Sequence, residues 1–191
     1  LSSSAVTLHS DVNVPASIGG SWVLLSAASP SGISEPDFTI SPSYRSYIFI
    51  ISNVRPASAA SFRVKAFLDG TIKSTGYLTQ NTFAYVNAAD DDYNVEETMT
   101  TTEFMKTENV GNTTAQGGIC AFMTLTSPTN TSVPHRFYGN FNFVNQSTYI
   151  YGGVSYGHDN NTTEAINKMR FYFEGQNIVS GNINMYGIKD A

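Results

Sequence analysis

Apolar and polar residues alternate along much of this chain with a period of two, which is typical of strands that bury one face. Within residues 62–68, Phe62 and Val64 stand on either side of Arg63. Residues 135–144 set three phenylalanines against arginine, tyrosine and asparagine in the same way. The pattern therefore predicts half-buried β-strands rather than amphipathic helices.

Other segments are continuous runs of β-branched and aromatic residues, and the run at 47–51 predicts a strand buried on both faces. Turn residues separate the runs, and Asp69-Gly70 favours a hairpin turn. We count about ten strands with turn residues between them, the pattern of an antiparallel β-sandwich of jelly-roll type. The clearest predicted strands lie at 21–25, 37–40, 47–51, 62–68, 71–73, 119–126, 135–144, 148–156, 168–173 and 182–188.

The composition supports this all-β prediction. Charged residues are 13% of the 191 residues, about half the usual share, whereas exposed helix faces favour Glu, Lys and Arg. The apolar content of 41% argues against disorder. The length fits one domain with a sizeable core. We predict a β-sandwich domain over residues 21–191, preceded by a Ser-rich arm or linker over residues 1–20.

The net charge of −5 argues against a nucleic-acid partner, since proteins that bind nucleic acid carry a basic surface. No apolar stretch approaches the length of a membrane span, so we expect no membrane insertion. Residues 1–10 lack the basic and apolar regions of a signal peptide, and the chain begins with Leu1. We interpret the chain as a mature or cut piece of something longer.

Motifs near both ends of the predicted domain follow a distinctive order. Residues 21–25 are S-W-V-L-L, residues 52–57 are S-N-V-R-P-A, and residues 169–188 are M-R-F-Y-F-E-G-Q-N-I-V-S-G-N-I-N-M-Y-G-I. This order resembles a domain that recurs in bacteriophage tail fibre and other virion surface proteins. The match covers about residues 20–188, and its specific part is the last segment, which in that family is a closing hairpin. Gln176 and Asn182 depart from the family pattern.

The resemblance implies a β-sandwich in an extracellular fibre on the virion surface, often a homotrimer in contact with other virion proteins. Our first hypothesis is a receptor-binding domain that attaches the phage to polysaccharide on the bacterial host. The alternative is a structural virion module, such as a head fibre, capsid decoration or tail adaptor, without a receptor of its own. A glycan-cleaving depolymerase is the least favoured alternative, and the fold alone does not choose between them.

Residues suited to catalysis or metal binding are few. Acidic residues gather at 88–97, where Asp90, Asp91 and Asp92 precede two glutamates, and we interpret this stretch as a solvated surface loop. A cation site at the three aspartates, or a glycosidase carboxylate pair, is a less favoured alternative. The histidines lack metal-binding spacing, and Cys120 lies in an apolar run as a small buried residue. We expect no enzymatic activity and no cofactor.

Tyrosines with amides and carboxylates nearby offer a surface for sugars. Aromatic faces cover the apolar side of a sugar ring, and polar groups bind its hydroxyls. The alternative is that these tyrosines are ordinary strand residues and that residues 158–161 form a plain turn. The predicted ligand-binding residues are Tyr85, Asp91, Tyr93, Tyr151, Tyr156, His158 and Asp159.

Overall fold

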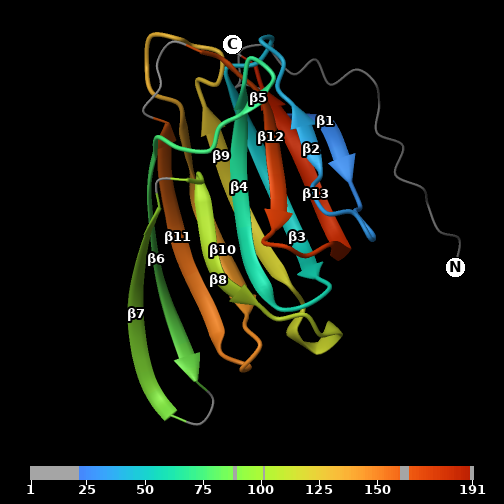
Figure 1. Cartoon of the computed structure of the whole chain (residues 1–191), viewed down its shortest axis with the longest axis vertical. Helices are drawn as coiled ribbons and strands as arrows, with labels where there is room; N and C mark the ends of the chain where they lie inside the picture. The colour runs from blue at the N-terminus through green and yellow to red at the C-terminus, as the bar shows by residue number, and fades with distance from the viewer. Residues whose placement is uncertain (1–21, 88–89, 101, 160–163, 190–191) are drawn as a thin grey trace, which may run out of the picture.

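The computed structural model describes residues 22–87, 90–100, 102–159 and 164–189, with the backbone alone for residues 87 and 90–100. Two antiparallel sheets pack face to face (Figure 1), which confirms the predicted all-β sandwich. The predicted arm, residues 1–20, lies outside the described residues. The described strands are β1 (Trp22–Ala28), β2 (Asp37–Thr39), β3 (Ser46–Pro56), β4 (Ala60–Leu68), β5 (Thr71–Ile72), β6 (Tyr77–Asn87), β7 (Asp90–Thr100), β8 (Met105–Val110), β9 (Ile119–Thr126), β10 (Arg136–Val144), β11 (Ile150–Asp159), β12 (Ile166–Phe173) and β13 (Ile178–Ile188).

The strand order is that of a jelly roll. The larger sheet contains the order β1-β13-β3-β9, and the smaller contains β2-β12-β4 with β8 paired to β4. The chain therefore crosses between the sheets from β1 to β2, β2 to β3, β3 to β4, β8 to β9 and β12 to β13. These eight strands make the two interlocked Greek keys of that fold, which buries one apolar face of each sheet against the other.

Four further strands extend the larger sheet beyond this jelly roll. After β9 the order continues β10-β11-β6-β7, so β7 forms the outer edge. The strands β9, β10 and β11 are consecutive in the chain and pair without a register shift. This regular pairing fixes which side chains of β10 and β11 lie opposite one another on each face.

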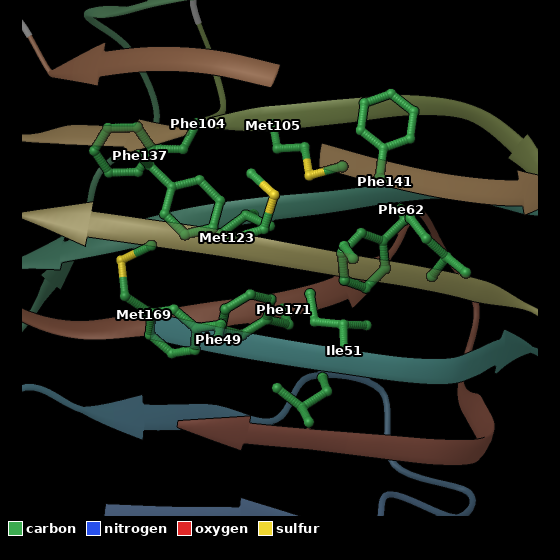
Figure 2. Close-up of a cluster of buried hydrophobic side chains, with 14 of the residues drawn as sticks. Phe49, Ile51, Phe62, Phe104, Met105, Met123, Phe137, Phe141, Met169 and Phe171 are labelled. Carbon is green, nitrogen blue, oxygen red and sulfur yellow. The ribbon is translucent and has the colours of Figure 1, made fainter. Parts of the chain in front are cut away.

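The core lies between the two sheets and is rich in aromatic and sulfur-containing side chains. Figure 2 shows Phe49, Met123 and Phe137 of the larger sheet pointing toward Met169 and Phe171 of β12 in the smaller. All five are essentially inaccessible to solvent. The segment 47–51 contributes to this core as a central strand of the larger sheet, and four of its five residues are buried, as predicted.

The predicted hairpin turn at Asp69-Gly70 is confirmed. Both residues adopt positive φ angles, 46° for Asp69 and 87° for Gly70, and they connect β4 to β5 through the Leu68–Thr71 pair. Two consecutive positive φ angles match the right-handed twist of the flanking strands. Aspartate and glycine are suited to these positions because both tolerate the left-handed region.

The sequence-based predictions for residues 88–97 and for Cys120 are wrong. The acidic stretch 88–97 is not a surface loop, because β7 begins at Asp90 and pairs with β6 over most of its length. Since β7 is an edge strand, charge there is compatible with pairing on one side and discourages pairing with other chains. Cys120 is half-buried rather than buried, and its thiol lies 3.1 Å from the side-chain oxygen of Asn53.

The final segment is not a closing hairpin. β12 pairs with β2 and β4 in the smaller sheet, whereas β13 pairs with β1 and β3 in the larger. β12 presents one apolar face, because Met169, Phe171 and Phe173 occupy alternate positions and are all buried. Ile183 and Met185 of β13 are buried as well, but on the inner face of the opposite sheet.

Ion pairs cover the outer face of the smaller sheet. The guanidinium of Arg170 donates to both carboxylate oxygens of Asp37, with N–O distances of 2.7 and 2.9 Å. Burial acts to raise the pKa of Asp37, but the hydrogen bonds and charge of Arg170, with those of Lys168, outweigh it. The net pKa of Asp37 is therefore lower than 3.8.

We expect Asp37→Asn to lower the free energy of unfolding by about 0.5–1 kcal/mol at neutral pH, a value reduced by solvent screening of this half-exposed pair. A lowered pKa in the folded state stabilises the protein above the unfolded-state pKa of 3.8 and loses that effect as the pH falls through the folded-state value. Urea unfolding of the parent protein and of Asp37→Asn between pH 7 and pH 2.5 measures how their difference in stability depends on pH. A difference that persists unchanged at the lowest pH would contradict the assigned role of the carboxylate.

Candidate functional site

An open hollow lies on the outer face of the larger sheet, where β10 begins and β11 ends. Its volume is about 300 Å³, the lower end of the range for sites that bind small molecules. Both strands carry it on the face that points away from the smaller sheet. The hollow is lined by Pro134, Arg136, Tyr138, Tyr156, Gly157 and His158.

The antiparallel register places the lining side chains in two facing pairs. Tyr138 lies directly opposite Tyr156, and Arg136 lies opposite His158. Alternation sends the intervening Phe137 to the core, where it is fully buried. Tyr156 and Tyr138 are 57% and 39% exposed, so their rings are available to a ligand.

Gly157 is required where it stands between Tyr156 and His158. A Cβ atom at this position would lie 2.5 Å from the backbone oxygen of Phe104, far inside the normal contact distance. Only glycine lets the segment before β8 approach the sheet this closely. The close packing supports the sheet directly beneath the hollow, so the site rests on rigid backbone.

A buried charge network lies on the other side of the same strand ends. The carboxylate of Asp159 contacts the ammonium of Lys73 at 2.5 Å and the Nδ1 atom of His135 at 3.1 Å. Asp159 and His135 are fully buried, and the backbone N–H of Asp159 donates to the carbonyl of His135 at 2.9 Å. The network therefore links His135 to Asp159, which are the chain neighbours of Arg136 and His158.

Tyr77 completes the surroundings of this network. Its hydroxyl accepts a hydrogen bond from the backbone N–H of Ala66 at 3.0 Å and donates one to the carbonyl of Lys73 at 3.3 Å. Burial raises the pKa of Tyr77, so the phenol stays protonated at neutral pH. A neutral phenol in these two bonds holds the backbone of Lys73 close to the carboxylate that its side chain contacts.

The structure brings two of the predicted ligand-binding residues together, since Tyr156 and His158 both line the hollow. Asp159 points to the opposite side of the sheet and is buried in the charge network. Tyr85 and Tyr151 stack on each other 4.9 Å apart on that inner face, near the other end of β11. These three residues belong to the interior rather than to the hollow.

The remaining predicted residues lie in β7. Asp91 and Tyr93 form part of this strand, together with the candidate cation ligands Asp90 and Asp92. Their side chains lie outside the described residues. Among the described residues, no group of three or more histidine, cysteine, aspartate or glutamate side chains gathers in a way that could hold a metal ion.

Sequence reasoning missed Pro134, Arg136 and Tyr138 as site residues. The alternation in 135–144 did place Arg136 and Tyr138 on the face opposite Phe137. The missing information was that β10 pairs with β11 in the register that sets Tyr138 against Tyr156. The sequence feature that would have suggested this pairing is a tyrosine, Tyr138 or Tyr156, in each of two predicted strands that follow one another in the chain.

The described side chains of the hollow offer groups that can bind a ligand. Two phenol rings offer flat apolar faces with polar edges, and the guanidinium and imidazole add hydrogen-bond donors. None of the described residues that line the hollow is a carboxylate, whereas glycosidases act through a pair of them. Elsewhere in the described part of the chain, no helix is long and apolar enough to cross a membrane.

Comparisons with known proteins add no relative to this description. The sequence matches no protein-family model and no curated protein. The functional argument therefore rests on the residues of this chain and on the geometry of the hollow.

Proposed function

We propose that this chain is a virion-surface domain of a bacteriophage that attaches to polysaccharide on the bacterial host. The observation that carries the proposal is the exposed pair of Tyr138 and Tyr156 in an open hollow on a rigid sheet. Two adjacent phenol rings provide a platform on which a sugar ring packs its apolar face. The likeness of residues 169–188 to the virion fibre family supports the same assignment.

The proposal is one of binding without catalysis. The described lining residues supply rings and donors, and no acid–base pair that would cleave a glycosidic bond is found among them. A shallow site of about 300 Å³ accommodates one or two sugar units, which bind weakly. The proposal therefore includes a homotrimer, in contact with other virion proteins, because several weak sites on one particle give firm adhesion.

A second candidate, a structural virion module, is favoured by another surface of the same sheet. Trp22 and Leu24 of β1 are more than half exposed, and the Trp22 ring lies 5.8 Å from that of Phe122 and 6.1 Å from that of Tyr186. Clustered exposed aromatic residues are typical of protein–protein contacts. In this candidate, virion proteins cover the outer face and no glycan is bound.

We expect Tyr156→Ala to weaken binding to a recognised polysaccharide about tenfold, because truncating an aromatic contact residue commonly costs more than about 1 kcal/mol. The purified chain is applied to immobilised lipopolysaccharides, capsules and teichoic acids, with competition by the soluble polymer. Tyr156→Phe keeps the ring and is expected to retain most of the affinity. Light scattering on the same samples gives the oligomeric state.

The matched control is Ile150→Ala, which removes an exposed apolar side chain, 62% exposed, from the other end of the same strand. It is expected to leave affinity unchanged. Saturable binding that is lost in Tyr156→Ala alone supports attachment through the hollow. Equal binding by all the variants would contradict attachment through the hollow and place the glycan site elsewhere on the chain. Binding to virion proteins and to no polysaccharide would favour the structural module instead.

A further inference from the structure

We infer that the hollow selects saccharides that carry a carboxylate, such as uronic acids, with the negative group held by Arg136. This inference rests on the proposed glycan-binding function and specifies the ligand class of the same site. It follows from how charge is distributed over the two outer faces of the sandwich, from the spacing of Arg136 and Tyr138, and from the rigidity of the strand ends that carry them.

Charge is scarce on the outer face around the hollow. On β9, β10 and β11, Arg136 and His158 are the only outward-facing residues with basic side chains, and no aspartate or glutamate faces outward on these three strands. The other outward-facing positions hold apolar residues, hydroxyls and amides. The hollow is therefore the one basic spot on this part of the face.

The basic side chains of the smaller sheet are arranged differently. On its outer face, Arg63 and Lys65 contact Glu103, and Arg170 contacts Asp37. Arg136, by contrast, is exposed and forms no ion pair with any described residue. A guanidinium without a carboxylate partner among the described residues, beside a hollow whose described lining contains none, can bind an anion from solution.

The geometry suits a sugar with a charged substituent. Residues two apart on a strand lie about 7 Å from each other on the same face, and this is the separation of Arg136 from Tyr138. A sugar ring packed on the two tyrosines therefore extends an exocyclic carboxylate toward the guanidinium. Arginine matches a carboxylate with two parallel hydrogen bonds, which gives both strength and direction.

His158 adds a second polar contact on the opposite strand. It faces Arg136 across the β10–β11 pair and lines the hollow, while its Nδ1 atom is buried and forms no hydrogen bond with a described residue. A carboxylate between Arg136 and His158 receives donors from both strands.

The strand ends that carry these two residues are held before any ligand arrives. His135 and Asp159, their chain neighbours, form the buried contact of the charge network, and a backbone hydrogen bond joins the same two residues. A site whose donors are already in position loses less entropy on binding. A single guanidinium held in position by these strand ends is sufficient to discriminate between charged and neutral sugars.

The test uses the polysaccharides that the chain binds, each in native form and after chemical reduction of its carboxylates to hydroxymethyl groups. Reduction keeps the sugar ring and removes the charge. We expect binding to fall about tenfold on reduction, and Arg136→Gln to lose the same factor on the native polymer and nothing on the reduced one. Raising the salt concentration should weaken only the binding of the native polymer.

Arg45→Gln is the matched control, because it removes an arginine that lies outside the lining of the hollow. It should leave the preference for the native polymer intact. Equal binding of native and reduced polymers, with no effect of Arg136→Gln, would overturn the charge inference and leave the glycan-binding proposal standing. Absence of binding to every polysaccharide would instead overturn both the charge inference and the glycan-binding proposal. A melting temperature close to that of the parent protein excludes misfolding of the Arg136→Gln variant.

Discussion

Replacing Phe171 by alanine is expected to lower the free energy of unfolding by about 3–5 kcal/mol. Phe171 is fully buried at the centre of the sandwich. Its ring centroid lies 5.5 Å from that of Phe38, 4.9 Å from Phe49, 6.3 Å from Phe62 and 6.4 Å from Phe137. These partners come from both sheets, so the cavity left by truncation cannot close by the movement of one strand.

Equilibrium unfolding in guanidinium chloride measures this loss. The matched control is Phe122→Ala, since Phe122 is 38% exposed on the outer face of the larger sheet and contacts Trp22 there. Its truncation leaves no enclosed cavity and is expected to cost about 1 kcal/mol or less. If the two variants were equally stable, the core would not lie between the sheets where Phe171 is placed.

The burial of Phe171 was predictable from the sequence because alternation is a local property. Met169, Phe171 and Phe173 occupy every second position of one segment, and any strand made from it must present them on one face. The turn at Asp69-Gly70 was predictable for a similar reason, since it depends on two residues and their backbone preferences. Period and turn chemistry together were sufficient for the all-β sandwich.

The pairing between strands was harder to predict from the sequence, because it depends on contacts between residues far apart in the chain. β12 and β13 are separated by a short turn and look like a hairpin, yet they lie in opposite sheets. The backbone crosses between the layers within residues 174–177, where Gly175 has a φ of 65°. Gly181, with a φ of 110°, lies at a register shift inside β13. Alternation describes the faces of both strands equally well in either arrangement, so it does not distinguish a hairpin from a crossing.

The candidate site shows the same limit. Tyr156 and His158 were recognised as suitable for a ligand, but so were Tyr85 and Tyr151, which face the interior. The residue type is the same on both faces, and only the register with neighbouring strands decides which tyrosines reach solvent. Arg136 was overlooked because its partner across the hollow, His158, is distant in sequence.

The buried charge network provides the second large effect, and Asp159→Asn is expected to cost about 3 kcal/mol of unfolding free energy. The substitution keeps the size of the side chain but leaves the ammonium of Lys73, only 11% exposed, without its negative partner 2.5 Å away. Removing one member of a buried ion pair is more harmful than removing both. Lys73→Met in the Asp159→Asn background is therefore expected to recover part of the loss.

Denaturant unfolding of the single and double variants measures the coupling between Lys73 and Asp159. The matched control is Asp69→Asn, in an exposed turn, which should change the free energy of unfolding by less than about 0.5 kcal/mol. Additive losses would show that the two charges do not depend on each other.

The network has a second consequence, because Asp159 adjoins His158 in the chain. Asp159→Asn should also weaken glycan binding, although Asp159 lies on the far side of the sheet from the hollow. Since the residue positions the site without touching the ligand, Lys73→Met in the same background should restore affinity and stability together.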